Sequence, residues 1–400
     1  MKPLKQQTPV RSQCMITGSA DVEVFFEMDA VPMMCNVLWP TRQAALSAPT
    51  GNIHLGFSPS SGHIFNTVFD ADLLDYDQSY ENSLHFSPRF QRYAEWLAAD
   101  LIERYQLRGK TIIDVGCGKG DFLRLICRMA GARGVGFDRS YEPTLEDALN
   151  PQVTFIQTFF DEVQDDRYHG DMICCRHVLE HIADPVGFLM DIRQALHQRD
   201  DAVVFFEVPN ALYTLRDKGI WDIIYEHVSY FTPNSLVRAF TTAGFDVLRV
   251  DETYGGQFLT IEARATDHIP GSAISTPLSG AQLAGLVRDF ADVSHHKFDE
   301  WCSRLDAFAV TGKQVMVWGS GSKGVTFLNV LHTQDQIAYV VDINPRKQGK
   351  FVAGSGQQIV APEFLREQPP QVVIVMNPLY REEIVATLAE LGLEADVLVA

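Results

Sequence analysis

Hydrophobic and polar positions follow two different periods along the chain, and the change of period marks the predicted elements. Apolar residues recur every three or four positions from Phe90 through RFQRYAEWLAADLIERYQL, which predicts a helix that begins at Ser87 and Pro88. After Lys110, short apolar runs such as TIIDVG, GVGFD and AVVFFEV alternate with helical segments. Buried parallel strands read as short continuous apolar runs, so this series predicts an α/β fold with a doubly wound, mostly parallel sheet.

The segments on either side of this series differ from it in pattern. Residues 1–75 are rich in turns and contain short strand-like runs, which predicts a small N-terminal β domain. Turn residues over 267–280 read as a linker, and a long amphipathic helix with Leu283 and Phe308 on its apolar side follows. A second, Rossmann-like α/β unit begins after Gly312. We therefore expect an N-terminal domain (1–75), a central domain (76–266), a linker and long helix (267–311) and a C-terminal domain (312–400).

Composition narrows the classes of function. The formal charge of -18 opposes phosphate backbones and anionic membrane surfaces, so nucleic acid and lipid partners are excluded. No apolar run approaches the length of a membrane span, and the first residues do not read as a signal peptide. The seven cysteines are scattered and odd in number, which favours a reducing cytoplasm over a disulfide framework. We expect a cytoplasmic monomer or homodimer that acts on a small molecule.

A glycine loop follows the first strand of the central series, in IIDVGCGKGDF. Gly116, Gly118 and Gly120 allow a tight turn and close approach of a ligand to the backbone, and Asp138 ends the next strand. A carboxylate in that place can accept hydrogen bonds from both hydroxyls of a ribose. The spacing favours an adenosyl ligand over a dinucleotide. The alternative is a turn that only joins a strand to a helix.

The same residues resemble a known family. IIDVGCGKGDF with GVGFD is similar to class I S-adenosylmethionine-dependent methyltransferases. From about Cys14 onward the chain resembles the three-domain C-methyltransferases that act on nucleotide-linked deoxysugars in bacterial secondary metabolism, through CRHVLEH, EVPN, YEHVSYF, YGGQF and WGSGSKG. The resemblance implies a central Rossmann-like methyltransferase sheet that binds S-adenosylmethionine. The expected cofactor contacts are Asp114, Gly116, Cys117, Gly118, Gly120, Asp138, Phe159 and Phe160. For the two phenylalanines, core packing is an equal alternative.

The stretch WDIIYEHVSYF carries the expected acid/base chemistry. Forming a carbon–carbon bond requires that a base first remove a proton beside a ketone. The resemblance implies His227 as this base, Glu226 as its orienting partner and Tyr225 as a donor to the enolate oxygen. The family has one residue between the tyrosine and the glutamate, and here Tyr225 is directly next to Glu226. The alternative is a buried polar network without a catalytic role.

Two further positions are candidates on the acceptor side. HVLEH (177–181) matches the H-x-x-E-H pattern of a zinc protease class, but it follows a strand of a ligand-binding sheet and has no third ligand motif. We therefore interpret His181 as a second acid/base or substrate contact and His177 as a packed or hydrogen-bonded residue. Tyr80 resembles a substrate contact of the family.

The N-terminal domain departs from the family, whose members carry two C-x-x-C pairs for zinc. Here the pairs read CMIT and SPSS, so Thr17, Ser58 and Ser61 stand where cysteines are expected. Hydroxyl groups are poor zinc ligands, which predicts a metal-free remnant of a zinc domain. An improvised site from Cys14, Cys35, His54 and His63 is the alternative.

Other functions remain open on the sequence alone. The C-terminal unit has Gly319, Gly321 and Gly324 in G-x-G-x-x-G, with Asp342 after the next strand, as in NAD-binding enzymes. The resemblance implies that this unit helps to build the acceptor cleft, so we favour a structural and acceptor-binding role for it, and a dinucleotide-like fold does not by itself fix a function. Methylation of oxygen or nitrogen on a small metabolite, and adenosyl binding without catalysis, are further alternatives.

Overall fold

The computed structural model describes residues 10–74, 80–144, 147, 151–160, 170–196, 201–267, 278–333 and 336–400. Within these residues the chain forms three sheets of four, seven and five strands, which confirms the predicted α/β class. No helix in the described ranges combines the length and the apolar character that crossing a membrane requires. The predicted domain boundaries stay predictions.

The first sheet is antiparallel, and one of its strands comes from a distant part of the chain. Its order is β1 (Glu23–Pro32), β2 (Thr50–Ser58), β3 (His63–Asn66) and β9 (Ser229–Tyr230), and the short helix α1 (Arg42–Leu46) lies between β1 and β2. Strand β9 pairs with β3 through Ile64 opposite Tyr230 and Phe65 opposite Ser229. The segment that carries His227 is therefore fixed against the N-terminal sheet.

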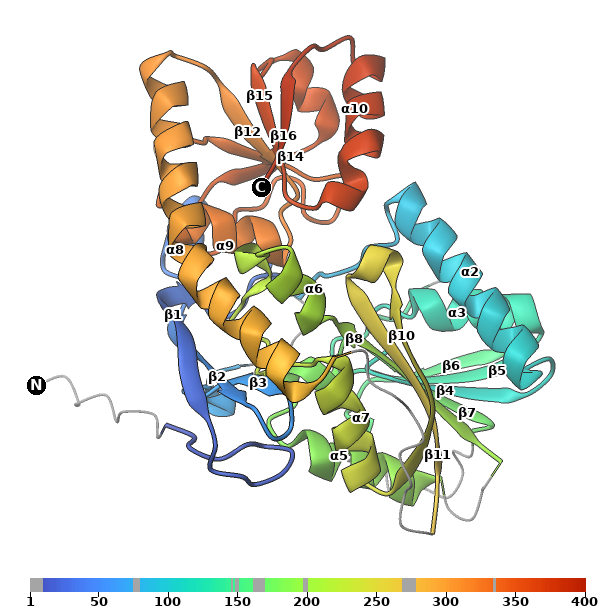
Figure 1. Cartoon of the computed structure of the whole chain (residues 1–400). Coiled ribbons are helices and arrows are strands. Elements are labelled where there is room, and N and C mark those ends of the chain that lie inside the picture. The colour runs from blue at the N-terminus through green and yellow to red at the C-terminus, as the bar shows by residue number, and fades with distance from the viewer. Residues whose placement is uncertain are drawn as a thin grey trace, which may run out of the picture.

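The central sheet has the order β10-β11-β8-β7-β4-β5-β6, and β11 is its reversed strand. The strands are β4 (Thr111–Val115), β5 (Arg133–Phe137), β6 (Val153–Ile156), β7 (Met172–Arg176), β8 (Val203–Pro209), β10 (Phe245–Thr253) and β11 (Phe258–Ala265). In Figure 1, helices α2 (Pro88–Tyr105) and α3 (Asp121–Ala130) cover one face, and α5 (Pro185–Ala195) and α7 (Pro233–Thr242) lie on the other. Successive residues of a strand point to opposite faces, so Cys174 packs with the first pair of helices and Cys175 with the second.

Helix α2 shows why these residues form these elements. The Ser87 side chain accepts a hydrogen bond from the Phe90 amide, Pro88 occupies the first turn, and Gln106 ends the helix in the left-handed conformation. The apolar face predicted from the period, including Phe90 and Leu101, is buried. The third strand is shorter than expected, because β6 ends at Ile156 and Phe159 lies beyond it.

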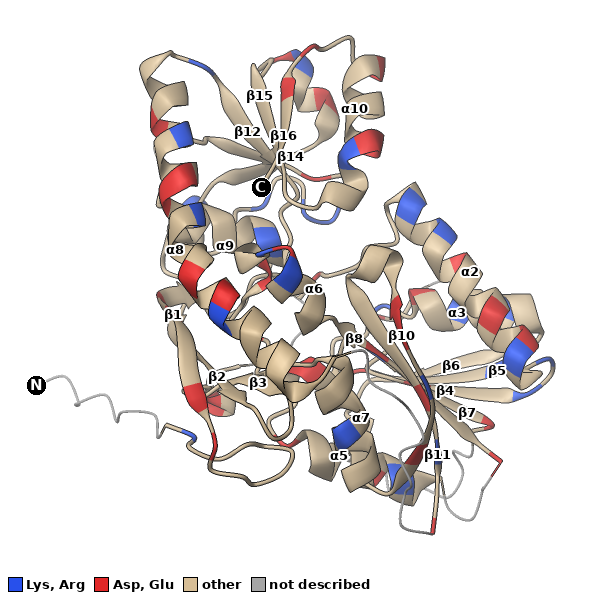
Figure 2. Ribbon diagram, viewed as in Figure 1, with Lys and Arg blue, Asp and Glu red and all other residues tan. Residues whose placement is uncertain are grey.

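The third sheet is parallel throughout, with the order β14-β13-β12-β15-β16. Its strands are β12 (Val315–Trp318), β13 (Tyr339–Val341), β14 (Gln358–Val360), β15 (Val372–Val375) and β16 (Asp396–Val399), with helices α9 (Ser322–Val330) and α10 (Arg381–Glu390). Helix α8 (Gly280–Val310) runs from beside this sheet to the N-terminal sheet and packs against β1 and α6 (Ala211–Arg216) (Figure 1). Figure 2 shows charged residues of both signs along α8 and α2, as expected for helices with one exposed side.

Candidate active site

A single cavity of about 800 Å³ joins the central sheet to the C-terminal sheet. It is lined by the glycine loop after β4, the turn after β7, the segment around His227 and the loops that follow β12, β13 and β15. The carboxyl ends of parallel strands meet at one edge of a sheet, which is where open α/β sheets bind ligands. Both parallel sheets direct that edge into the same space.

The glycine loop after β4 has the backbone that its sequence predicts. Gly116, Gly118 and Gly120 all have positive φ, at 71°, 56° and 80°. A side chain on Gly116 would place its Cβ 2.2 Å from Val178, whereas a Cβ on Gly118 would meet no protein atom within 4 Å. Since Gly118 lines the cavity, the space beside it is open to a ligand.

Asp138, directly after β5, is held against this loop. Its Oδ2 accepts a hydrogen bond from the Gly118 amide at 2.8 Å, and its Oδ1 accepts one from the Ser140 amide at 2.7 Å. A carboxylate oxygen has two lone pairs, so Oδ2 retains capacity for a ribose hydroxyl. The Asp138 carboxylate and the open space beside Gly118 therefore fit an adenosyl ligand.

The other predicted cofactor contacts differ in exposure. Burial raises the pKa of Asp114 to about 7, although the nearby Arg176 opposes the shift. Burial also raises the pKa of the Cys117 thiol well above its usual value, so that it is neutral. Phe159 is 43% exposed and lines the cavity, whereas Phe160 also packs edge-on against Phe137 at 5.2 Å. Phe159 is thus available to an adenine, and Phe160 contributes to the core as well as to the cavity.

Two histidines form the opposite part of the cavity wall. The rings of His181 and His227 lie edge to face, with centroids 4.9 Å apart. The Nδ1 of His181 donates to the backbone oxygen of Glu226 at 2.9 Å, which places a proton on that nitrogen. Burial, followed by the neighbouring His181, lowers the pKa of His227 to about 3. His227 is therefore neutral near pH 7, the form that accepts a proton.

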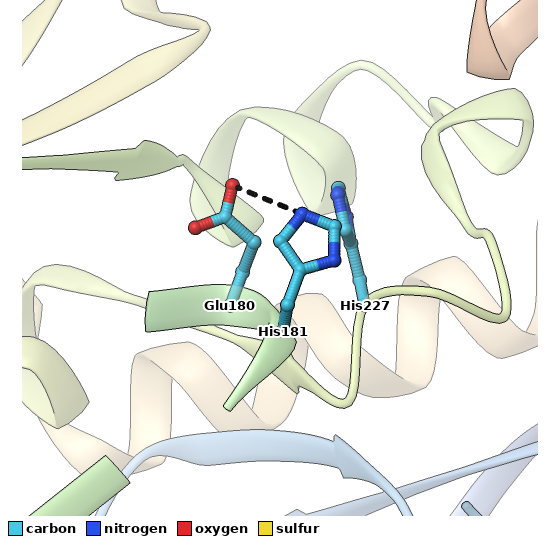
Figure 3. A group of neighbouring side chains, drawn as sticks. All are labelled: Glu180, His181 and His227. Atoms are coloured by element: carbon cyan, nitrogen blue, oxygen red, sulfur yellow. Dashed lines mark ion pairs between the residues drawn. The ribbon is translucent and has the colours of Figure 1, made fainter. Parts of the chain in front are cut away.

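Glu180 completes this group, with Oε1 4.0 Å from Nε2 of His181 (Figure 3). Glu180, His181 and His227 are side chains that bind transition metals, and one ligand atom from each lies within 4.8 Å of the others. Two nitrogen ligands of one zinc ion lie at most about 4.2 Å apart, since each bond is about 2.1 Å long. The 4.0 Å between Glu180 and His181 is within that limit, so the distances alone do not exclude a metal; we interpret the trio as an acid/base group because His227 is neutral and lines the cavity.

The loop after β12 repeats the geometry of the loop after β4. Asp342 accepts from the Ser320 amide at 3.0 Å and from the Asn344 amide at 2.9 Å, just as Asp138 accepts from Gly118 and Ser140. A Cβ on Gly324 would lie 2.0 Å from the backbone oxygen of Gly319, so only glycine fits there. The two loops face one cavity from two sheets.

Comparison with protein families shows which family this chain resembles. The family described as "Methyltransferase domain" matches residues 89–250, and the family described as "C-methyltransferase C-terminal domain" matches residues 254–396. The chain belongs to the S-adenosylmethionine-dependent C-methyltransferases. This confirms the predicted family, the predicted enzyme class and the predicted cofactor.

Relatives of the methyltransferase agree with this assignment. The C-methyltransferase NovU of Streptomyces niveus is 28% identical over 304 residues, which are 71% of this chain and 70% of NovU. The ubiquinone biosynthesis O-methyltransferase of Yersinia pestis (strain Pestoides F) is 30% identical over 107 residues, which are 25% of this chain and 43% of that enzyme. The second match covers a quarter of this chain and less than half of that enzyme, so it carries no conclusion about the acceptor.

Solved structures resemble less than half of the methyltransferase. The riboflavin-analogue dimethyltransferase RosA from Streptomyces davawensis is 22% identical, with 44% of this chain and 56% of that chain covered and a TM-score of 0.36. Magnesium protoporphyrin IX methyltransferase from Synechocystis is 17% identical, with 44% and 84% covered and a TM-score of 0.35. The strand order of the central sheet, rather than these matches, defines the fold.

The predicted partnership between Glu226 and His227 is wrong in this structure. The Oε2 of Glu226 accepts from the Cys35 amide at 2.9 Å, and the carboxylate also interacts with the Tyr80 hydroxyl. The carboxylate therefore makes no hydrogen bond to His227. The two residues are adjacent in the chain, and their side chains diverge because Glu226 is drawn toward the N-terminal sheet. Glu180 is the carboxylate that lies beside the two histidines.

Tyr225 also does not take the predicted place. Its hydroxyl accepts from the Asp70 amide at 3.1 Å, its ring packs on Phe69, and it is absent from the cavity wall. Tyr80 does line the cavity, as expected for a substrate contact. The Tyr80 hydroxyl accepts from the Asn36 side chain at 3.4 Å and interacts with the Glu226 carboxylate.

Sequence reasoning missed Asn36, Glu180 and Lys347 in this site. Lys347 is buried in the loop after β13 and donates to Asn36 at 3.3 Å, across 311 positions of sequence. No local pattern signals a contact over such a separation. Glu180 could have been found from the sequence, since it lies inside the HVLEH motif. That motif was considered only as a zinc protease pattern, which the context excluded.

Three of the four positions at which zinc-binding cysteines were expected, Cys14, Ser58 and Ser61, do come together, but they form a hydrogen-bonded group. Cys14 Sγ lies 3.2 Å from Ser61 Oγ, Ser61 donates to Ser58 at 3.0 Å, and Ser58 donates to Asp21 at 2.8 Å. One thiol among hydroxyls does not fit zinc. The improvised alternative does not assemble in the described part of the chain, where the group with metal-binding potential is Glu180, His181 and His227 rather than Cys14, Cys35, His54 and His63.

Proposed function

We propose that this C-methyltransferase methylates a carbon beside the ketone of a nucleotide-linked keto-deoxysugar, through an enolate formed by His227. The observation that carries the proposal is the arrangement of one cavity, with a histidine pair in its wall and a nucleoside-type loop from each of the central and C-terminal sheets. Bound S-adenosylmethionine supplies an electrophilic methyl group on a positively charged sulfur.

His227 is suited to accept the proton. It is neutral near pH 7 because burial and His181 lower its pKa to about 3, and it lines the cavity. A base must be unprotonated before the acceptor binds. The lowered pKa also makes it a weak base, so the site must stabilise the imidazolium once it forms.

The enolate oxygen requires a hydrogen-bond donor at the same wall. Tyr80 lines the cavity and interacts with Asn36 and with the Glu226 carboxylate. Two buried neighbours place this phenol, and its single O–H donates to the developing negative charge once it turns from the Glu226 carboxylate toward the acceptor. We assign to Tyr80 the role that the sequence suggested for Tyr225.

The nucleotide of the acceptor is proposed to bind at the C-terminal loop. Asp342 has the geometry of Asp138, and helix α9 begins directly after the loop, where its free amides favour phosphate. Lys323 in the first turn of α9 and Lys347 both line the cavity and add positive charge. An NAD-dependent activity at this loop is the alternative, and nicotinamide that co-purifies with the protein would support it.

The test is mass spectrometry of a panel of nucleotide-linked keto-deoxysugars incubated with the protein and S-adenosylmethionine in deuterated water. We expect a methylated product and deuterium at the α-carbon. In His227→Gln, both should fall by about 100-fold or more, which is the usual contribution of a general base. Tyr225→Phe is the matched control and should keep both within about twofold, because Tyr225 lies outside the cavity wall.

The outcomes separate the candidate functions. Methylation at oxygen or nitrogen without α-exchange would contradict enolate chemistry and favour a heteroatom methyltransferase. Donor binding without a product across the panel would remove the sugar assignment. Full activity of His227→Gln would show that another group removes the proton.

A further inference from the structure

Glu180 is a buried carboxylate beside the histidine pair that the proposed mechanism has not used. It lies in the turn Leu179–His181 after β7 and is 1% exposed. Its Oε1 is 4.0 Å from Nε2 of His181, and its Oε2 has no hydrogen-bond partner among the described residues. A buried carboxylate oxygen without a partner is costly and requires an explanation.

The position of Glu180 is fixed by a chain of alternating charges. His177 has a left-handed backbone, with φ 57°, and lies between the two carboxylates Glu180 and Glu207, at 3.7 Å and 2.9 Å. Glu207 is in turn paired with Arg176 at 2.7 Å. Burial lowers the pKa of His177, but Glu180 and Glu207 outweigh it and raise the pKa to about 9, so His177 is a cation near pH 7. Of the two roles predicted for His177, packed or hydrogen-bonded, the structure shows the second, with two carboxylates as partners.

Methyl transfer moves a positive charge across this cavity. The α-proton goes to His227, and the C–H electron pair becomes, through the enolate, the new bond to the methyl carbon. The C–S electron pair remains with sulfur, which becomes neutral. The positive charge that was on sulfur is then on the imidazolium. In a buried site that charge needs an anion close by.

We propose that Glu180 is the counter-ion of the imidazolium that forms on His227, and that His177 and Glu207 hold it in position for this role. The proposal rests on the proposed enolate mechanism. Ligand atoms of Glu180, His181 and His227 lie within 4.8 Å of one another, and the Glu226 carboxylate is directed to Cys35 instead (Figure 3). The Glu180 carboxylate oxygen on the side of the two histidines is Oε1, 4.0 Å from His181, and its charge stabilises the cation that forms on His227 (Figure 3).

The other groups around His227 make Glu180 the relevant anion. The turn Leu179–His181 packs against β9 and presents His181 and Glu180, and His177 precedes that turn. Tyr230 of β9 contacts the ring of His227 at 5.9 Å. His181 and His177 lower the pKa of His227, and Glu180 raises it. Removing the Glu180 charge would thus make His227 a still weaker base.

The experiment measures exchange of the acceptor's α-proton with deuterated water in the absence of the donor, together with kcat and KM for methyl transfer. In Glu180→Gln, exchange and kcat should both fall by about 10- to 100-fold, which matches the one to two pKa units that a neighbouring charge contributes. KM and the affinity for S-adenosylmethionine should stay within about threefold. Glu180→Asp keeps the charge and should recover at least half of the loss on a logarithmic scale. Asp191→Asn, an exposed carboxylate of helix α5 outside the cavity wall, is the matched control and should exchange at least tenfold faster than Glu180→Gln.

Each outcome decides a separate point. Normal exchange in Glu180→Gln, or equal loss in Glu180→Gln and Glu180→Asp, would overturn the role of Glu180 while leaving His227 as the base. Absence of exchange in the unaltered protein would instead overturn the enolate mechanism itself. If Glu180→Gln does not fold, His177→Gln replaces it, because it keeps the carboxylate but releases it. Exchange should then fall about tenfold, and unchanged exchange would overturn the proposal.

Discussion

At the scale of single residues, His63 shows how burial alone sets a charge state. Its ring is fully buried, stacks on Phe65 and lies 3.4 Å from Ser229 through Nε2. Burial lowers its pKa to about 3. The unfolded chain binds a proton near pH 6.5 and the native protein does not, so His63 contributes stability above pH 6.5 that is lost as the pH falls toward 3.

This predicts a specific difference in acid sensitivity. Between about pH 7 and pH 5, the His63 contribution to the free energy of unfolding should fall by about 2 kcal/mol. His63→Gln cannot titrate, so its free energy of unfolding should fall by about 2 kcal/mol less than that of the unaltered protein over this range. Urea unfolding at both pH values measures the difference. The same pH dependence in both proteins would show that His63 is protonated in the native state.

Residue roles were predictable where they depend on local geometry. The places of Gly118 and Asp138 follow from the strand–loop–helix spacing, and the structure joins them by a hydrogen bond at 2.8 Å. Glu226 and Tyr225 were assigned by analogy to a motif, but their directions are set by Cys35 and Asp70, which are 191 and 155 positions away. Sequence spacing contains no information about such partners.

At the scale of elements, the glycine loop after β4 must satisfy two constraints: it packs against the protein, and it leaves space for the ligand. Gly116 and Gly118 share the left-handed conformation, which costs a residue with a side chain about 1–2 kcal/mol. Of these two glycines, Gly116 alone faces a close protein neighbour, since its Cβ would lie 2.2 Å from Val178. The first glycine therefore serves packing, and the second serves the ligand.

Alanine substitutions should separate the two constraints. Gly116→Ala should lower the free energy of unfolding by about 2 kcal/mol or more, because backbone strain and overlap add. Gly118→Ala should lower it by only about 1–2 kcal/mol and reduce the affinity for S-adenosylmethionine at least tenfold. Thermal unfolding and calorimetric titration with the donor measure the two effects. Equal donor affinity in Gly118→Ala and the unaltered protein would place the donor elsewhere.

Strand β9 marks the limit of prediction for elements. Its two residues pair with β3, although the sequence places them deep inside the central series. Periodicity detects long regular segments such as α2 and α8, whereas a two-residue strand has no period. The strand forms because β3 of the N-terminal sheet has an unpaired edge. The pattern of residues around 229–230 does not indicate that edge, because it comes from a distant part of the chain.

At the scale of the whole molecule, two side-chain contacts join the central sheet to the C-terminal one. Gln257 and Asn377 exchange hydrogen bonds through both amide groups, at 2.9 Å and 2.8 Å. Tyr254 donates to the Tyr380 hydroxyl at 2.7 Å nearby. All four residues border the cavity, so the contacts set the distance between its two glycine loops.

Breaking the hydrogen bonds between Gln257 and Asn377 should weaken binding of the acceptor and leave binding of the methyl donor unchanged. In Asn377→Leu, KM for the acceptor should rise about tenfold, because the Oε1 of the buried Gln257 loses its donor and the two loops lose their spacing. The affinity for S-adenosylmethionine should stay within about twofold, since that site lies on the central sheet alone. Gln368→Ala, an exposed amide of the same C-terminal unit, is the control. An equal change in both affinities would indicate general unfolding rather than lost spacing.

The pairing of β9 with β3 limits how acceptor specificity can be exchanged between related enzymes. The wall around His227 is assembled from Asn36, Tyr80, Glu180 and Lys347, which come from four separate stretches of chain. A chimera cut at a linker would transplant one of these stretches and leave its partners behind. A recombination experiment that aims to move acceptor choice must therefore carry the N-terminal sheet, the segment 224–230 and the loop after β13 together.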